Sequence, residues 1–125
     1  MMGRMTITLY GIPNCDTVKR ARAWLAEHDV DAQFHDFKKQ GVPDAALDRW
    51  LAQLGWEALV NRRGTTWRKL DDATRAAVVD TPSARAALLA NPSLVKRPVV
   101  DWGSRVGLTV GFDVQEWARC ADVKE

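Results

Sequence analysis

The sequence contains only two cysteines, Cys15 and Cys120, in a chain of 125 residues. Two thiols cannot build the disulfide framework of a small secreted protein. Together with His28 and His35 they also lack the spacing of zinc ligands, so no metal site is expected. The remaining question is whether either cysteine is chemically reactive or whether both are small buried hydrophobic residues.

Long apolar runs and a strong excess of one charge are absent as well. No apolar stretch approaches the roughly 20 residues that a membrane-spanning helix needs. The N-terminal segment also lacks the apolar core of a signal peptide. The formal net charge of +2 is too small to favour direct binding of nucleic acid. We therefore expect a cytoplasmic protein that binds neither membranes nor, directly, nucleic acids.

The chain does contain enough apolar material for one folded domain. Hydrophobic residues make up 46% of the sequence and charged residues 27%, which excludes a disordered chain. This length suits a single core, so residues 1–125 are expected to form one domain. The six tryptophans are an unusually large number, and their expected role is packing.

The first third of the chain has the pattern of a strand, a helix and a second strand. Residues 5–10 alternate apolar and polar side chains and predict a strand, which a Gly-Ile-Pro segment ends. Asn14 is the expected N-cap of a helix over residues 15–28. Residues 34–37 predict a short second strand. A strand–helix–strand unit of this length makes the two strands parallel.

The middle of the chain predicts helices. Residues 43–55 run from a proline to a glycine and carry apolar side chains at helical spacing. Residues 61–66 predict a turn or loop, and further short helices are expected to start near Asp71 and Thr81. Residues from about 40 to 95 are therefore expected to form an all-helical insertion.

The last third returns to the periodicity of strands. Residues 98–102 and 105–110 flank a Gly-Ser pair and predict a β-hairpin. Asp113 and Glu116 form an acidic version of a capping box at the start of a final helix. The order β-α-β, then helices, then β-β-α predicts an α/β fold with a mixed four-stranded sheet, which is thioredoxin-like in outline.

Cys15 is the best candidate for chemistry. It lies where the first strand gives way to the first helix, so backbone N–H groups and the helix dipole would stabilise its thiolate. Lys19 is one turn further along the same face, whereas the carboxylate of Asp16 opposes a second negative charge. An inert, buried Cys15 is the alternative. Cys120 lies beside the apolar face of the last helix, where its expected role is packing.

Arginine side chains could complete an anion site at the same helix N-terminus. Arg62, Arg63 and Arg97 are the candidates, since a guanidinium donates two parallel hydrogen bonds to a carboxylate or oxyanion. The alternative is that these are solvated loop charges. The bond between Arg97 and Pro98 is either cis, which would bring the Arg97 backbone close to the cysteine loop, or an ordinary trans bond.

Four segments also carry a resemblance to a known family. They are residues 9–19 (LYGIPNCDTVK), 61–70 (NRRGTTWRKL), 96–99 (KRPV) and 110–112 (VGF). Together they resemble the arsenate reductase ArsC family, in the branch of the YffB and Spx-like proteins. The resemblance spans nearly the whole chain and implies a thioredoxin-like fold with a helical insertion.

The resemblance implies roles for individual residues. Cys15 matches the nucleophilic cysteine of the family, and Arg97 with Pro98 matches an arginine followed by a cis-proline. Arg63 matches the oxyanion-site arginine of the middle segment, with Arg62 as the adjacent alternative. Members with a lone cysteine use glutathione as co-substrate, because its thiol resolves the mixed disulfide. The expected glutathione- or substrate-binding residues are Asn14, Lys19, Arg63, Arg97 and Pro98.

We therefore expect a glutathione-dependent thiol–disulfide oxidoreductase that acts on a small oxidised substrate or mixed disulfide through Cys15. Arsenate reductases of the family have a third arginine where this chain reads VGLT at residues 106–109, which argues against arsenate as the substrate. The alternative is a non-enzymatic, Spx-like regulator that binds RNA polymerase or another protein. Such regulators carry a CxxC motif, and Val18 at its fourth position excludes a disulfide switch here.

Overall fold

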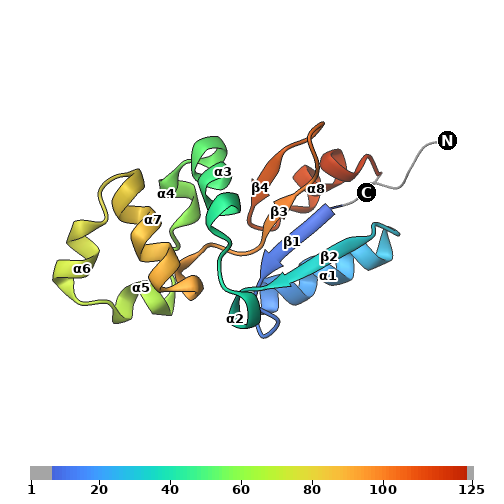
Figure 1. Cartoon of the computed structure of the whole chain (residues 1–125). Coiled ribbons are helices and arrows are strands. Elements are labelled where there is room, and N and C mark those ends of the chain that lie inside the picture. Colours follow the sequence, from blue (N-terminus) through green and yellow to red (C-terminus); the bar gives the residue numbers. More distant parts are fainter. Residues whose placement is uncertain (1–6, 124–125) are drawn as a thin grey trace. The chain divides into compact units, whose positions relative to one another are not determined.

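The computed structural model describes residues 7–123, which divide into two compact units. One unit comprises residues 7–36 and 97–123 and contains the β-sheet, and the other comprises residues 37–96 and consists mainly of helices (Figure 1). Residues 5 and 6, where the sequence predicts the start of the first strand, lie outside the described part.

The first unit contains a mixed four-stranded sheet, as the sequence predicted. Its strands, in the spatial order β2-β1-β3-β4, are β1 (Ile7–Gly11), β2 (Ala32–Asp36), β3 (Val99–Asp101) and β4 (Leu108–Val110). β1 pairs in parallel with β2, because a helix connects the two, and antiparallel with β3. β3 and β4 form the predicted antiparallel hairpin.

The turn of this hairpin is longer than the Gly-Ser pair that the sequence predicted. The N–H of Trp102, just after β3, still donates to the carbonyl of Gly107 at 2.9 Å, and the carboxylate of Asp101 accepts a hydrogen bond of 2.9 Å from the N–H of Gly103. The N–H of Gly107 then donates to the carbonyl of Gly103 at 2.8 Å. The prediction of a two-residue turn is therefore wrong, because the chain reverses over residues 103–107 and not over Gly103 and Ser104 alone.

Helices α1 (Asp16–Glu27) and α8 (Val114–Ala121) share one core with the sheet. Trp117 of α8 is fully buried, and its ring meets those of Trp102 and Trp24 edge-on, with centroids 5.2 and 5.8 Å apart. The predicted N-cap of α8, Asp113, accepts a hydrogen bond of 3.0 Å from the N–H of Glu116. The core residues are Ile7, Leu9, Val18, Ala21, Trp24, Leu25, Val100, Trp102, Trp117 and Ala118.

The second unit is a set of mostly short helices. They are α2 (Phe37–Gln40), α3 (Asp44–Leu54), α4 (Trp56–Leu59), α5 (Thr65–Lys69), α6 (Asp72–Ala77), α7 (Thr81–Ala90) and the 3₁₀ helix η1 (Pro92–Leu94). α3 lies between Pro43 and Gly55, as predicted, and Gly55 has the positive φ of 85° that favours glycine. α6 and α7 also begin where the sequence placed them.

Three α-helices and the 3₁₀ helix of this unit were not predicted. α2, α4 and α5 have four or five residues each, which is too short for a helical period to be visible in the sequence. Phe37, predicted at the end of the second strand, instead begins α2 and buries its ring near that of Trp50, at 6.2 Å. Across residues 7–123, no helix is both long and apolar enough to cross a bilayer.

The burial of Trp117 predicts its contribution to stability. Trp117→Ala should lower the free energy of unfolding by about 3–5 kcal/mol, because it removes a large ring from a packed aromatic cluster. Urea denaturation measures this change. Gln115→Ala, at an exposed position of the same helix, is the control and should stay within about 0.5 kcal/mol of the parent. Equal stabilities of the two variants would contradict the assignment of Trp117 to the core.

Candidate functional site

Cys15 is the N-cap residue of α1, at the end of the loop that follows β1. The sequence placed this cap at Asn14, and that prediction is wrong. The extended backbone of Cys15 (φ −142°, ψ 122°) immediately precedes the helix, and its carbonyl accepts a hydrogen bond of 2.9 Å from the N–H of Lys19. The thiol therefore occupies the position from which a capping side chain normally meets the first backbone N–H groups.

Gly11 lets α1 begin this close to the sheet. A Cβ atom at Gly11 would lie only 2.9 Å from Cγ2 of Val18, which is fully buried in the first turn of α1. A side chain at position 11 would therefore displace that turn. The contact between Gly11 and Val18 fixes the N-terminus of α1, and with it the backbone groups that face Cys15.

The surroundings of Cys15 favour its thiolate. Burial raises the pKa of the thiol, but the backbone N–H of Val18, the hydrogen bond and positive charge of Arg97, and the N–H of Thr17 together lower the pKa below its ordinary value. The side chain makes no regular capping hydrogen bond, yet these N–H groups stabilise a negative charge on the sulfur. Cys15 is only half-buried, so a reagent can reach it.

Arg97 reaches Cys15 from the segment that leads into β3. Val99 of β3 pairs with Tyr10 of β1, which brings the start of β3 beside the loop after β1. The Arg97–Pro98 peptide bond is cis, the first of the two alternatives left open by the sequence, and Pro98 is buried. The structure thus brings together Cys15 and Arg97, two of the predicted site residues.

Asn14 and Lys19 flank Cys15 but are both exposed. Among the described residues, the groups that lower the pKa of Cys15 are Val18, Arg97 and Thr17, and Lys19 is not one of them. The expected roles of Asn14 and Lys19 in ligand binding therefore stay predictions. Within residues 7–123, no group of three or more His, Cys, Asp or Glu side chains is arranged to hold a metal ion.

Cys120 has the opposite electrostatic surroundings. Burial and the negative charge of Glu116 raise the pKa of its thiol, and the charge of Arg119 only partly opposes them. Its side chain packs against the hydrophobic core, as the sequence predicted. Of the two thiols, Cys15 is the one whose environment favours a nucleophilic thiolate.

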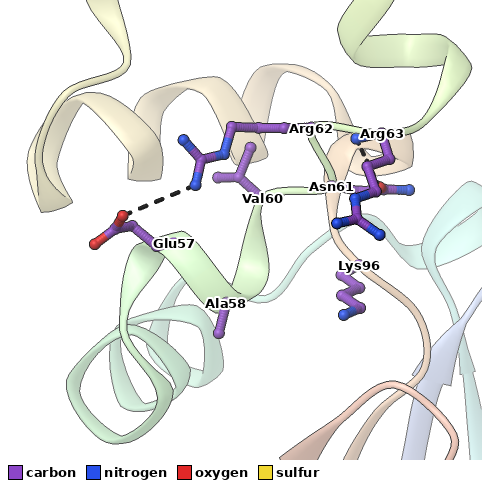
Figure 2. Close-up of a pocket in the computed structure, with 7 residues that line it drawn as sticks. All are labelled: Glu57, Ala58, Val60, Asn61, Arg62, Arg63 and Lys96. Atoms are coloured by element: carbon purple, nitrogen blue, oxygen red, sulfur yellow. Dashed lines mark hydrogen bonds and ion pairs between the residues drawn. The ribbon is translucent and has the colours of Figure 1, made fainter.

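Arg63 lies in the helical unit, in a groove of about 460 Å³ (Figure 2). The neighbouring Arg62 turns toward Glu57, with Nη2 and Oε2 3.8 Å apart, and its guanidinium also lies over the ring of Trp56 at 5.8 Å. Among the described side chains, none pairs with the guanidinium of Arg63 or the ammonium of Lys96. Arg63 and Lys96 are therefore the cations of this groove that are available to an anion. The groove is lined by Glu57, Ala58, Val60, Asn61, Arg62, Arg63 and Lys96.

Lys96 is the groove residue that sequence reasoning missed. An isolated antiparallel bridge between Val60 and Val95 places Lys96 beside the segment that holds Arg63, and its N–H donates to the carbonyl of Leu59 at 2.7 Å. A single bridge has no period, so the sequence pattern could not predict it. The basic pair at positions 96 and 97 is the signal in the sequence that points to Lys96.

The mixed sheet, the cysteine at the start of its first helix and the cis-proline before β3 define a thioredoxin-like α/β protein with a thiol whose surroundings favour the thiolate. The chain belongs to the ArsC family, whose family model matches residues 10–120.

Two solved structures and one further relative show the range of the similarity. The structure of a YffB protein is 46% identical, with a TM-score of 0.86, and covers 92% of this chain and 98% of that one. An arsenate reductase (ArsC) related protein from Brucella melitensis is 48% identical, with a TM-score of 0.72 and coverages of 95% and 97%. The global transcriptional regulator Spx of Streptococcus pyogenes is 31% identical over 113 residues, 88% of this chain and 81% of Spx.

The contact between Arg97 and Cys15 predicts how the reactivity of the thiol depends on pH. In a Cys120→Ser background, Arg97→Gln should raise the pKa of Cys15, because it removes a hydrogen bond and a positive charge that favour the thiolate. Alkylation by iodoacetamide would then require a higher pH. The rate of alkylation measured against pH gives this midpoint.

Arg105→Gln is the matched control, because it removes the same charge from an exposed position in the β3–β4 turn. Its midpoint should equal that of the parent. Identical midpoints for Arg97→Gln and the parent would show that Arg97 does not stabilise the thiolate.

Proposed function

We propose that this protein is a glutathione-dependent thiol–disulfide oxidoreductase with Cys15 as its nucleophile. The observation that carries the proposal is the lowered pKa of a half-exposed thiol at the N-terminus of α1, beside Arg97. A thiol with a lowered pKa is ionised to a greater extent near neutral pH, and the thiolate is the attacking species. Membership of the ArsC family agrees with such a role for Cys15.

The proposed reaction has two exchange steps. The Cys15 thiolate attacks a disulfide between a substrate thiol and glutathione, which forms a mixed disulfide of Cys15 with glutathione and releases the substrate thiolate. The thiolate of a second glutathione then attacks this mixed disulfide, so that oxidised glutathione leaves and the Cys15 thiolate is restored. In the net reaction the substrate–glutathione disulfide and one glutathione thiol become the substrate thiol and oxidised glutathione, and no second cysteine of the chain takes part.

The other predicted residues have supporting roles in this proposal. Arg97 stabilises the sulfur anion of Cys15 in the resting protein and again when the thiolate is released. In this proposal, Asn14, Lys19 and Pro98 would contact a glutathione bound to Cys15. Arg63 would bind a carboxylate, for which a guanidinium has the matching geometry.

Mass spectrometry of the protein treated with oxidised glutathione tests the proposal. The Cys120→Ser variant should gain the mass of one glutathione, located at Cys15 by peptide mapping, and reduced glutathione should remove it. Cys15→Ser, which retains Cys120, is the matched control and should gain little, because burial and Glu116 raise the pKa of that thiol. Absence of the adduct at Cys15 in excess oxidised glutathione would refute the proposal.

A regulatory function is the second candidate, and the similarity to Spx is the observation that favours it. In this case the protein binds RNA polymerase or another protein, and the thiol is not required. Cys15→Ser should then co-elute with purified bacterial RNA polymerase in size-exclusion chromatography as well as the parent does. Failure of the parent protein to co-elute would count against binding to this partner.

A further inference from the structure

We propose that Arg68 is a positioning residue that fixes the backbone of Arg63, and thereby aims the Arg63 side chain into the groove where it binds an anion. The proposal rests on the proposed function in one respect, because it takes Arg63 to be an anion-binding residue. It adds a residue for which neither the motifs nor the comparisons suggest a role.

Both peptide groups that flank the Cα atom of Arg63 are held by side chains. On one side, the N–H of Arg63 donates to Oδ1 of Asn61 at 3.2 Å. On the other side, the carbonyl of Arg63 accepts a hydrogen bond of 2.6 Å from Nη2 of Arg68. A residue has only two soft backbone torsions, so fixing both neighbouring peptide planes fixes the direction in which its side chain leaves the chain.

Asn61 is itself anchored through its backbone. Its N–H donates to the carbonyl of Leu94 at 2.9 Å, next to the bridge between Val60 and Val95. The backbone of Gly64 passes close to the side chain of Asn61, because a Cβ atom at Gly64 would lie only 2.6 Å from Nδ2 of Asn61. The turn that carries Arg63 is therefore tightly fixed on its N-terminal side, and Arg68 supplies the hydrogen bond on its C-terminal side.

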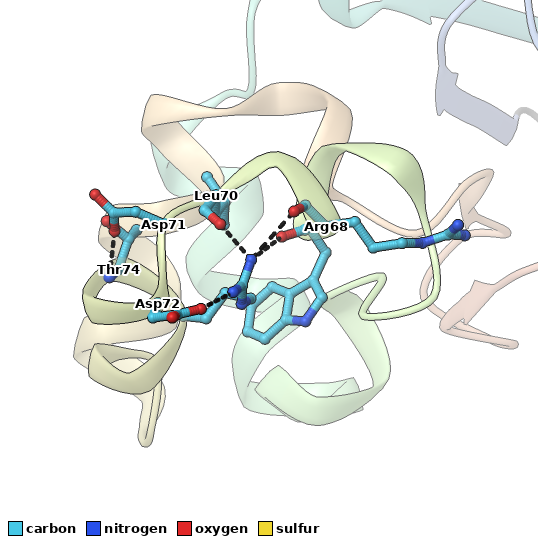
Figure 3. Close-up of polar contacts among 7 residues, drawn as sticks. Arg68, Leu70, Asp71, Asp72 and Thr74 are labelled. Atoms are coloured by element: carbon cyan, nitrogen blue, oxygen red, sulfur yellow. Dashed lines mark hydrogen bonds and ion pairs between the residues drawn. The ribbon is translucent and has the colours of Figure 1, made fainter.

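Arg68 is in turn held by Arg75, which closes the end of α5. Nη1 of Arg75 donates to the carbonyl of Arg68 at 3.1 Å and to that of Trp67 at 3.4 Å, and it also bonds the carbonyl of Leu70. The other terminal nitrogen of Arg75 pairs with Asp72. Carbonyls at the end of a helix lack partners within it, and one guanidinium here serves several of them. Figure 3 shows the side chain of Arg68 extending away from this junction.

The contacts of Arg68 argue for positioning rather than for direct binding. Arg68 does not line the groove that contains Arg63 and Lys96. Among the described residues, its guanidinium bonds a backbone carbonyl and pairs with no carboxylate. The hydrogen bond to Arg63 is therefore the one structural contribution that its charged group makes here.

A sulfate titration at constant ionic strength tests the proposal, with the backbone amide signals of residues 63 and 64 followed by NMR. Arg68→Gln should raise the Kd for sulfate by about 3- to 10-fold, as expected for the loss of the one hydrogen bond that Arg68 donates to the carbonyl of Arg63. It should also shift the amide signal of Arg63 before any sulfate is added. The Kd of Arg68→Lys should lie between those of the parent and Arg68→Gln, because an ammonium can still donate to a carbonyl. This variant keeps the test decisive if Arg68→Gln does not fold.

Arg85→Gln is the matched control, because it removes the same charge from the same unit. It breaks an ion pair with Asp48, in which Nε of Arg85 lies 2.7 Å from Oδ1 of Asp48. Its sulfate Kd and its Arg63 amide signal should equal those of the parent. Equal losses in Arg85→Gln and Arg68→Gln would assign the effect to net charge and overturn the proposal. An unchanged Kd in Arg68→Gln, or no response of the Arg63 amide to sulfate in the parent, would overturn it as well.

The sulfate titration and the glutathione experiment measure changes at different residues. The adduct reports on Cys15 and the sulfate response on Arg63. A chain that forms the adduct but shows no effect of Arg68→Gln would refute only the positioning role. A chain that forms no adduct would refute the oxidoreductase and leave the sulfate result to decide the role of Arg68.

Discussion

The contact between Gly11 and Val18 is the constraint on which the thiol site depends. Val18 presents its methyl groups to the core and its backbone N–H to Cys15, so one residue both anchors the helix and stabilises the thiolate. The first N–H groups of a helix have no partner within it and can fray. Here the burial of Val18 against the end of β1 holds the first turn in place. The chemical property of the sulfur is therefore a consequence of hydrophobic packing one turn away.

Two chain segments far apart in the sequence lower the pKa of Cys15, and neither does so by burial. The N–H groups of Thr17 and Val18 come from the helix that Cys15 itself starts, whereas Arg97 arrives through the pairing of β1 with β3. Cys120 shows the effect of burial combined with a neighbouring negative charge. Its thiol is half-buried to a similar degree, but Glu116 is its neighbour, and its pKa moves in the opposite direction. Position relative to fixed charges and dipoles separates the two cysteines.

Elements with a long period or strong end signals could be predicted from the sequence. The strand–helix–strand unit gave the parallel pairing of β1 with β2, and the segment between Pro43 and Gly55 gave α3. The N-cap of α1 could not be predicted, because the preference of asparagine for such positions is only a tendency, and the structure places the cap one residue later, at Cys15. The four-residue helix at Phe37 and the wide turn after Asp101 likewise depend on tertiary contacts and on single side-chain hydrogen bonds.

The same limit applies to the paired arginines of the helical unit. The sequence could identify Arg62 and Arg63 as candidates, but adjacent residues in a turn point in different directions, and no periodicity decides which one faces a ligand. Both side chains line the groove, and Glu57 and Trp56 engage that of Arg62. Each of these exposed contacts contributes little free energy alone. Together they distinguish the two arginines, because the ion pair and the ring contact engage the guanidinium of Arg62 and leave that of Arg63 available to an anion in the groove.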